Sequence, residues 1–218
     1  MAIPSPVPPQ GRTRLVLAVL LAAAVGAIAA LLIAPRWSTP GDDSAEAGFA
    51  RDMATHHAQA VEMSFVIRDK SADDQLRTLA YDIIVTQSTQ RGVFMGWLQE
   101  WGLPQASRRP RMAWMPGHAG MTGEAGHGVA QMHGMASDDE LRRLRTAEGV
   151  DAEVLFLQLM IRHHEGGVLM ARALMGQSQR DGIVQIARSI EEGQAAEVAQ
   201  MTAMLAKRGA RPYDSLLE

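Results

Sequence analysis

The sequence predicts an all-α protein: an antiparallel four-helix bundle built from two copies of one helical hairpin, with a transmembrane helix before it. The first observation is a repeat. Residues 46–63 read EAGFARDMATHHAQAVEM, residues 153–170 read EVLFLQLMIRHHEGGVLM, and an offset of 107 aligns them without a gap. The second is a run of 19 apolar or small residues at 15–33. Four long helices in two equivalent hairpins pack most simply as an antiparallel bundle.

The N-terminal part is expected to lie in and near a membrane. Residues 1–14 are proline-rich and are predicted to be a disordered cytoplasmic segment. Residues 15–34 are long enough to cross a bilayer core of about 30 Å, and Arg12 and Arg14 before them favour a cytoplasmic N-terminus. Cleavage as a signal peptide, giving a secreted protein, is the alternative. Residues 35–44 read as a linker, and both alternatives place the rest of the chain outside the cytoplasm.

The bundle is predicted to span residues 45–209. Its hairpins are expected at 45–102 and 151–209, each ended by a glycine followed by a proline, and a tail of 210–218 follows. Ser137 and Glu140 match a capping box, which predicts a short helix before the second hairpin. The helices are expected at about 44–70, 74–101, 138–147, 151–176 and 181–208.

The connection at 103–136 has no helical periodicity, because glycines and prolines interrupt it. It is rich in methionine and histidine, and we expect it to be mobile without metal and to supply weaker metal ligands. These candidates are Met112, Met115, His118, Met121, His127, Met132, His133 and Met135.

Composition excludes several functions. The net charge is −3, which offers no electrostatic case for nucleic-acid binding. The chain has no cysteine, so thiolate metal sites and disulfides are impossible, but it has 14 methionines. No nucleophile elbow or phosphate-binding loop is present, and we expect no enzymatic activity.

The repeated His-His pairs are the main candidate metal ligands. Residues three and four apart share a helix face, so each copy carries methionine and histidine on one stripe. Neighbouring histidines diverge by about 100°, and we expect one of each pair to face the bundle and the other a groove or solvent. A pseudo-twofold axis would bring the two His-His pairs together. The candidate ligands are Met53, His56, His57, Met63, Met160, His163, His164 and Met170.

Thioether and imidazole ligands together favour Cu(I), because soft ligands select soft ions. A di-iron bundle should carry Glu-x-x-His on two helices, and the spacing occurs only at Glu124 and His127, in the connection. His164 and Glu165 begin a zinc-protease motif, but its second histidine position holds Val168. Core filling by methionine and a purely structural histidine network remain open alternatives.

Three segments, MATHHAQAVEM, MIRHHEGGVLMA and MHGMASDDELRRL, resemble the signatures of domain-of-unknown-function family 305. The resemblance covers about residues 45–208. It implies a ferritin-like four-helix bundle, export or membrane anchoring and, in some members, copper binding. Gly167 stands where members often have alanine, which is expected to loosen the helix locally.

The leading hypothesis is a membrane-tethered, extracytoplasmic protein that binds Cu(I) for buffering, tolerance or transfer. Its location would be a single-pass cell membrane protein, and its partner a copper transporter or chaperone. The alternatives are a helical bundle without metal, acting in structure or interaction, and a ferritin-like metal oxidase.

Overall fold

The computed structural model describes residues 9–37, 39–117 and 132–217. Within these residues it contains six helices and no strand. The chain forms two compact units, residues 1–39 and residues 40–218. The second unit contains the predicted bundle.

Helix α1 spans Pro9–Trp37. It begins before the predicted start at residue 15 and continues into the predicted linker, so residues 9–14 are helical and not disordered. The predicted disorder of residues 1–8 lies outside the described residues. Among the described parts of the helices, we find none that is both long and apolar enough to cross a membrane. The predicted transmembrane anchor is therefore not supported.

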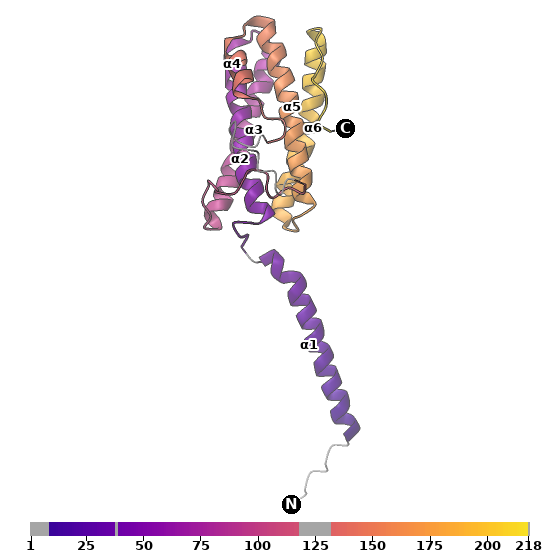
Figure 1. Ribbon diagram of the computed structural model, residues 1–218. Helices are drawn as coiled ribbons and strands as arrows, with labels where there is room; N and C mark the ends of the chain where they lie inside the picture. The colour runs from indigo at the N-terminus through magenta and orange to yellow at the C-terminus, as the bar shows by residue number, and fades with distance from the viewer. Residues whose placement is uncertain (1–8, 38, 118–131, 218) are drawn as a thin grey trace, which may run out of the picture. The chain divides into compact units, whose positions relative to one another are not determined.

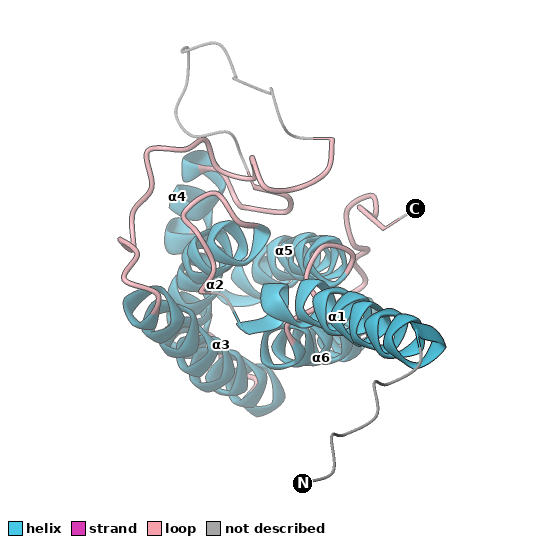
Figure 2. Ribbon diagram, turned by 90° about the horizontal axis from the view of Figure 1, so that it is seen from below, coloured by secondary structure: helices cyan, strands magenta, loops and turns pink. Residues whose placement is uncertain are grey.

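Four long helices make up the bundle, and their ends lie close to the predicted ones (Figures 1 and 2). Ser44 and Asp73 cap the two helices of the first hairpin through their side-chain oxygens, as preferred N-cap residues do. Glycines in the left-handed region follow the ends of both hairpins, Gly102 with φ 68° and Gly209 with φ 70°. The helices are α2 (Ala45–Lys70), α3 (Asp74–Glu100), α5 (Gly149–Met175) and α6 (Asp181–Lys207).

The short helix α4 (Asp138–Thr146) confirms the capping-box prediction. Ser137 accepts from the Glu140 backbone N–H, and the Glu140 side chain accepts from the Ser137 backbone N–H. Helix α4 packs against α2 and α5, and Figure 2 shows it on the outside of the four-helix arrangement.

The hairpins meet along α2 and α5. Helix α2 packs against α3 and α5, and α5 also packs against α6. At one end of this contact the residue after α2, Ser71, donates from Oγ to Oε1 of Glu153 near the start of α5. At the other end Ser178, after α5, donates to Oε1 of Glu46 near the start of α2. The two helices are therefore antiparallel, and the two junctions are equivalent under the offset of 107.

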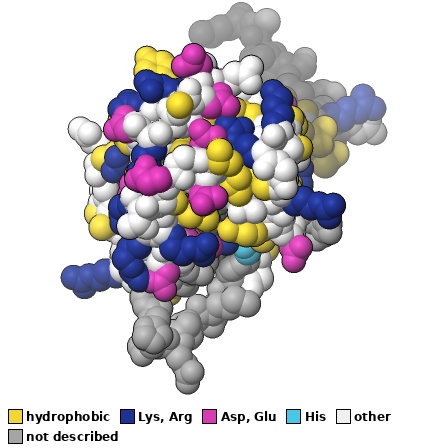
Figure 3. Space-filling model, turned by 90° about the horizontal axis from the view of Figure 1, so that it is seen from above, with side chains coloured by type: hydrophobic (Ala, Val, Ile, Leu, Met, Phe, Trp, Pro, Cys, Tyr) yellow, Lys and Arg dark blue, Asp and Glu magenta, His cyan; other side chains and the backbone are white. Residues whose placement is uncertain are grey.

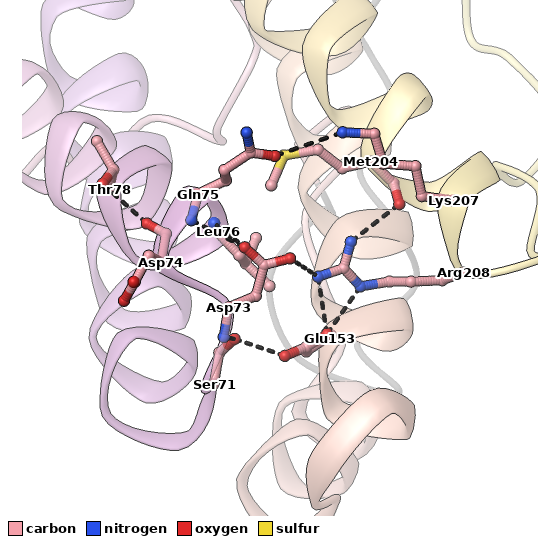
Figure 4. A network of polar contacts seen from close by, with 10 residues as sticks. All are labelled: Ser71, Asp73, Asp74, Gln75, Leu76, Thr78, Glu153, Met204, Lys207 and Arg208. Carbon is pink, nitrogen blue, oxygen red and sulfur yellow. Dashed lines mark hydrogen bonds and ion pairs between the residues drawn. The ribbon is translucent and has the colours of Figure 1, made fainter.

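The junction at Glu153 also contains a charged network (Figure 4). Arg208, which ends α6, donates from Nε to Glu153 over 2.8 Å and lies 2.7 Å from Oδ2 of Asp73. It ties α6 to the beginnings of α3 and α5. The opposite junction has a looser ion pair, with 3.6 Å between Nε of Arg180 and Oε1 of Glu46.

Two apolar cores fill the bundle. One contains Met63 and Met160, and the other contains Met53 and Met170. The paired histidines lie between these positions on both α2 and α5, so they form a polar layer between the two cores. On the end of the molecule shown in Figure 3, acidic and basic side chains are interspersed and histidine reaches the surface only in a small patch.

Candidate metal site

All four paired histidines, His56, His57, His163 and His164, are fully buried at 0% exposure. The expectation that one of each pair faces solvent or a groove is therefore wrong. The reason is that α2 and α5 each pack against two other long helices, and also against the short helix α4. Two neighbouring side chains that diverge by about 100° on one helix can then both point into the protein interior.

The Nε2 atom of each imidazole makes a hydrogen bond. His56 donates to the backbone oxygen of His133 over 3.1 Å, and His163 donates to the backbone oxygen of His56 over 3.1 Å. His57 donates to Oε1 of Gln90 over 2.8 Å, and His164 donates to Oε2 of Glu197 over 2.6 Å. Each partner is an oxygen that accepts, so the hydrogen-bond network assigns the proton to Nε2 in all four rings.

The four Nδ1 atoms are left with lone pairs and have no hydrogen-bond partner among the described residues. They are buried in the interior, where an unsatisfied polar atom is costly. A histidine ligand usually donates its other ring N–H to a carboxylate or a carbonyl, which orients the ring and makes the ligating nitrogen a better donor. The donor set therefore fits a metal ion bound through Nδ1.

Burial also keeps the imidazoles of His56, His57 and His163 neutral. Desolvation lowers the pKa of His56 to about 3 and that of His57 to about 3, and it lowers the pKa of His163 well below its usual value. Neighbouring imidazoles lower these pKa values further. Neutral imidazole is the form that binds metal, so protons do not compete for these three rings at physiological pH.

The imidazoles do not converge on one point. The His56 and His163 rings stack face to face, with centroids 3.7 Å apart. His57 and His164 lie 6.4 Å and 6.3 Å from their neighbours in sequence, measured between ring centroids. Within the described residues, no group of three or more His, Asp or Glu side chains forms a preassembled metal site. A site with three or more of these imidazoles would therefore require ring rotation. A site with one or two imidazoles would need further ligands, which the flanking thioethers can supply.

Other polar atoms lie unpaired in the interior. Gln87 and Gln194, which the offset relates, are 2% and 4% exposed, and neither amide has a hydrogen-bond partner in the described structure. The side chain of Gln194 lies against Gly167, where an added Cβ would come within 2.1 Å of its Oε1. Gly167 therefore makes room for a buried amide, and α5 runs through it without a break.

The methionines predicted as ligands, Met53, Met63, Met160 and Met170, are all 0% exposed and lie on both sides of the histidine layer. In the connection, Met112, Met115 and Met132 are buried in the core that contains Met53 and Met170, and Met135 packs against it. His133 is half-buried. The candidates His118, Met121 and His127 lie outside the described residues.

The beginning of the connection is held on α2, which differs from the predicted mobility. Asp52 accepts from the backbone N–H of Met112 and from Nε1 of Trp114. Burial raises the pKa of Asp52, although both hydrogen bonds oppose that shift. Arg51 donates from Nε to the backbone oxygen of Pro104. The sequence concealed this anchoring because its partners are 53 to 62 residues apart.

The end of the connection, residues 132–136, is also held. Gln59 bonds both the N–H and the C=O of Ala136. Gly134, at φ 77°, lies so close to α5 that an added Cβ would come within 2.3 Å of the Arg162 backbone oxygen. This segment borders an open hollow lined by Met132, His133, Gly134, Met135, Ser137, Glu140 and Arg162.

Gln90 and Glu197, the hydrogen-bond partners of His57 and His164, were missed from the sequence. A signal for them existed, since each lies 33 residues after its histidine and the offset of 107 relates the two positions. Without a structure, nothing distinguished them from other polar positions on the second helix of each hairpin.

Solved structures resemble this chain. A DUF305 protein of Streptomyces coelicolor, described as a candidate secreted protein, has 45% identity and a TM-score of 0.72, covering 80% of this chain and 99% of that one. A DUF305 fragment from Deinococcus radiodurans has 31% identity and a TM-score of 0.61, covering 75% and 96%. CopM in its Cu(II)-bound form has 30% identity and a TM-score of 0.55, covering 73% and 94%.

We found no significant match among curated proteins. The model of the family "Domain of unknown function (DUF305)" matches residues 46–205, and the chain belongs to that family.

Proposed function

We propose that this protein binds copper, as Cu(I) in preference to other ions, and buffers it or hands it on. The ligands are drawn from the buried layer of paired histidines and from the methionines that flank it on α2 and α5. We propose a binding role and not catalysis, because the bundle helices carry no Glu-x-x-His sequence of the kind that holds di-iron centres.

The observation that carries this proposal is the set of four buried Nδ1 lone pairs. A purely structural histidine would be expected to satisfy both ring nitrogens, because a buried polar atom without a partner costs about 1–3 kcal/mol. Here four rings leave the same atom unpaired and bond through the other. That pattern corresponds to imidazoles oriented from behind for a ligand in front.

Copper is favoured over other metals by the residues near the imidazoles. Thioethers and imidazoles are ligands for soft ions, and the chain has no cysteine to make a typical structural zinc site. CopM, whose structure resembles this one, has been crystallised with Cu(II). That observation concerns CopM, and it supports testing copper first.

We further propose that the open hollow at residues 132–136 is an outer capture site. Its lining includes the half-buried His133 and Met135 and the buried Met132. The backbone oxygen of His133 accepts the hydrogen bond of His56, so the outer segment and the buried layer are in direct contact. An ion caught at the hollow would have a short path inward.

The location that suits this role is outside the cytoplasm, where thiols tend to be oxidised and thioether sites have an advantage. The Streptomyces coelicolor relative, described as a candidate secreted protein, is consistent with it. Protease added to intact spheroplasts should digest the bundle, and fractionation of the envelope should show whether the protein remains with the membrane. Complete protection of the bundle would contradict the proposed location.

The test of copper binding is competition with a chromogenic Cu(I) chelator under reducing conditions. Replacing all four paired histidines with alanine should lower Cu(I) affinity by more than the about 10- to 100-fold that loss of an outer-shell partner costs. Met204→Leu is the matched control. Met204 is also buried, but it lies near the end of α6, where its backbone oxygen accepts from Arg208 (Figure 4).

The specific alternative is a histidine layer that only supports packing, which the existing Nε2 hydrogen bonds and the His56–His163 stack favour. Under that alternative, the quadruple variant loses stability. The Cu(I) affinity of the wild-type protein is then no higher than that of a scrambled Met-rich peptide. Circular dichroism of each variant separates loss of fold from loss of ligand.

A further inference from the structure

The two halves of the histidine layer differ in the chemical type of one hydrogen-bond acceptor. His57 and His164 are equivalent under the offset of 107, and each donates its Nε2–H to a side chain 33 residues further along the chain. In the first hairpin that acceptor is the amide of Gln90, and in the second it is the carboxylate of Glu197. The distances are 2.8 Å and 2.6 Å. Position and geometry are thus the same, but the charge is not.

From this difference we infer that Glu197 is a positioning residue that makes the His164 side of the layer the stronger ligand for a doubly charged ion. The inference rests on the proposed copper-binding function. It extends that function by giving the site a defined tolerance for Cu(II) beside Cu(I), set by one side chain that does not itself bind the metal.

The first physical reason is the hydrogen bond. A carboxylate bound to one ring N–H draws the proton towards itself and raises the electron density on the opposite nitrogen, which strengthens that nitrogen as a ligand. An amide oxygen in the same place orients the ring but polarises it less, because charge-assisted hydrogen bonds are about twice as strong as neutral ones. Nδ1 of His164 is therefore the stronger electron donor to a metal ion than Nδ1 of His57.

The second reason is charge. Glu197 is an acidic side chain hydrogen-bonded to a fully buried ring, and its own side chain is 24% exposed. Attraction between a carboxylate and a cation scales with the charge of the cation, so an ion at His164 gains more if it is doubly charged. The stronger Nδ1 donor and the nearby negative charge therefore both favour the binding of Cu(II) over that of Cu(I).

The experiment uses the full chain and compares four proteins: wild type, Glu197→Gln, Gln90→Glu and the double exchange of both. Cu(II) affinity is measured by competition with nitrilotriacetate, and Cu(I) affinity is measured with a chromogenic chelator under dithionite. Electron paramagnetic resonance of the Cu(II) forms reports whether nitrogen ligands persist. Amide and carboxylate both accept the Nε2–H, so the metal-free proteins should keep similar thermal midpoints.

Glu197→Gln should lower Cu(II) affinity by about 10- to 100-fold and Cu(I) affinity by less. Gln90→Glu should raise Cu(II) affinity, and the double exchange should return it close to wild type. The inference is overturned if Glu197→Gln leaves Cu(II) affinity unchanged, or if both copper ions weaken equally. If the wild type binds neither ion, the proposed function fails as well, so the two failures are distinguishable.

Discussion

The two hairpins share one frame and differ in what surrounds it. Both place a His-His pair at the same height of the first helix, and each places a glutamate, Glu46 or Glu153, against a serine of the other hairpin. These elements depend on helix spacing and on the pseudo-twofold axis. The two serine–glutamate contacts and the His56–His163 stack join the two copies.

The hairpins differ at positions that contact the connection between them. Asp52 anchors the connection on α2, whereas the equivalent position on α5 is the apolar Leu159. Gln59 reaches residue 136 with a full side chain, but its counterpart is Gly166, which faces the same segment with none. The comparison teaches that the duplicated frame builds a symmetric histidine layer and that a single connection makes it asymmetric.

Gly166→Ala is the substitution that we expect to disturb the packing of the connection on α5 most. An added Cβ would lie 2.0 Å from the His133 backbone oxygen and 3.0 Å from the backbone nitrogen of Gly134. Two backbone atoms cannot move aside as a flexible side chain would, so residues 132–136 should be displaced. We expect a loss of about 3 kcal/mol in the free energy of unfolding, measured by urea denaturation.

The matched control for that variant is Gly193→Ala, in the middle of α6, where an added Cβ meets nothing within 4 Å. Alanine favours a helix over glycine by up to about 1 kcal/mol, so this change should be neutral or stabilising. Equal destabilisation by both variants would show that the close approach of His133 to α5 is not what Gly166 serves.

The next comparison is between the junctions. Glu153 accepts from both Ser71 and Arg208, whereas Glu46 accepts from Ser178 and lies further from Arg180. Glu153→Ala should therefore cost about 2 kcal/mol of unfolding free energy, and Glu46→Ala should cost about 1 kcal/mol. Denaturation of both variants in one buffer checks the order. A larger cost for Glu46→Ala would reverse our view of which junction is tighter.

The helices and the meeting of the histidine pairs could be predicted from the sequence, because they depend on local signals and on symmetry. Caps such as Ser137 and terminators such as Gly102 act within a few residues. An in-register repeat implies an axis, and an axis brings equivalent residues together. His56 and His163 do stack as that argument requires.

The burial of all four histidines could not be predicted, because it depends on how many neighbours each helix has. Periodicity tells which face of α2 is apolar, but not that α3 and α5 cover two directions at once. The docking of the connection was hidden for a similar reason. Its partners Asp52 and Trp114 are far apart in sequence, and its glycines and prolines resemble those of a mobile segment.

Acid should expose another difference between the hairpins. Hydrogen bonds from the Leu76 backbone N–H and from Arg208 hold the pKa of Asp73 below its usual value, and the equivalent position in the second hairpin is Arg180. A carboxyl with a lowered folded pKa stabilises the fold fully above the unfolded value of about 3.9, and that contribution is lost as pH falls from there through the lower, folded pKa. Thermal midpoints should therefore fall from pH 5 to pH 3.

In the Asp73→Asn variant, the thermal midpoint should fall less between pH 5 and pH 3 than in wild type. This difference should be smaller than the loss of stability caused by Glu153→Ala, because the Asp73 side chain is 35% exposed. Glu140 continues to contribute, since hydrogen bonds from Arg162 and Ser137 outweigh burial and lower its pKa. Asp74→Asn removes a charge at the next position, on the exposed side of α3, and is the control. A fall as steep in Asp73→Asn as in wild type would contradict this assignment.

The smallest expected effect tests whether the hairpins unfold together. Gly96 on α3 corresponds to Ala203 on α6, both are exposed, and an added Cβ at Gly96 meets nothing within 4 Å. Gly96→Ala should stabilise the protein and Ala203→Gly should destabilise it, each by about 0.5–1 kcal/mol. Because the junctions at Glu46 and Glu153 tie each hairpin to the other, both changes should shift one common denaturation midpoint. If Gly96→Ala shifts only part of the transition, the hairpins unfold separately, and the histidine layer between them would open when either one does.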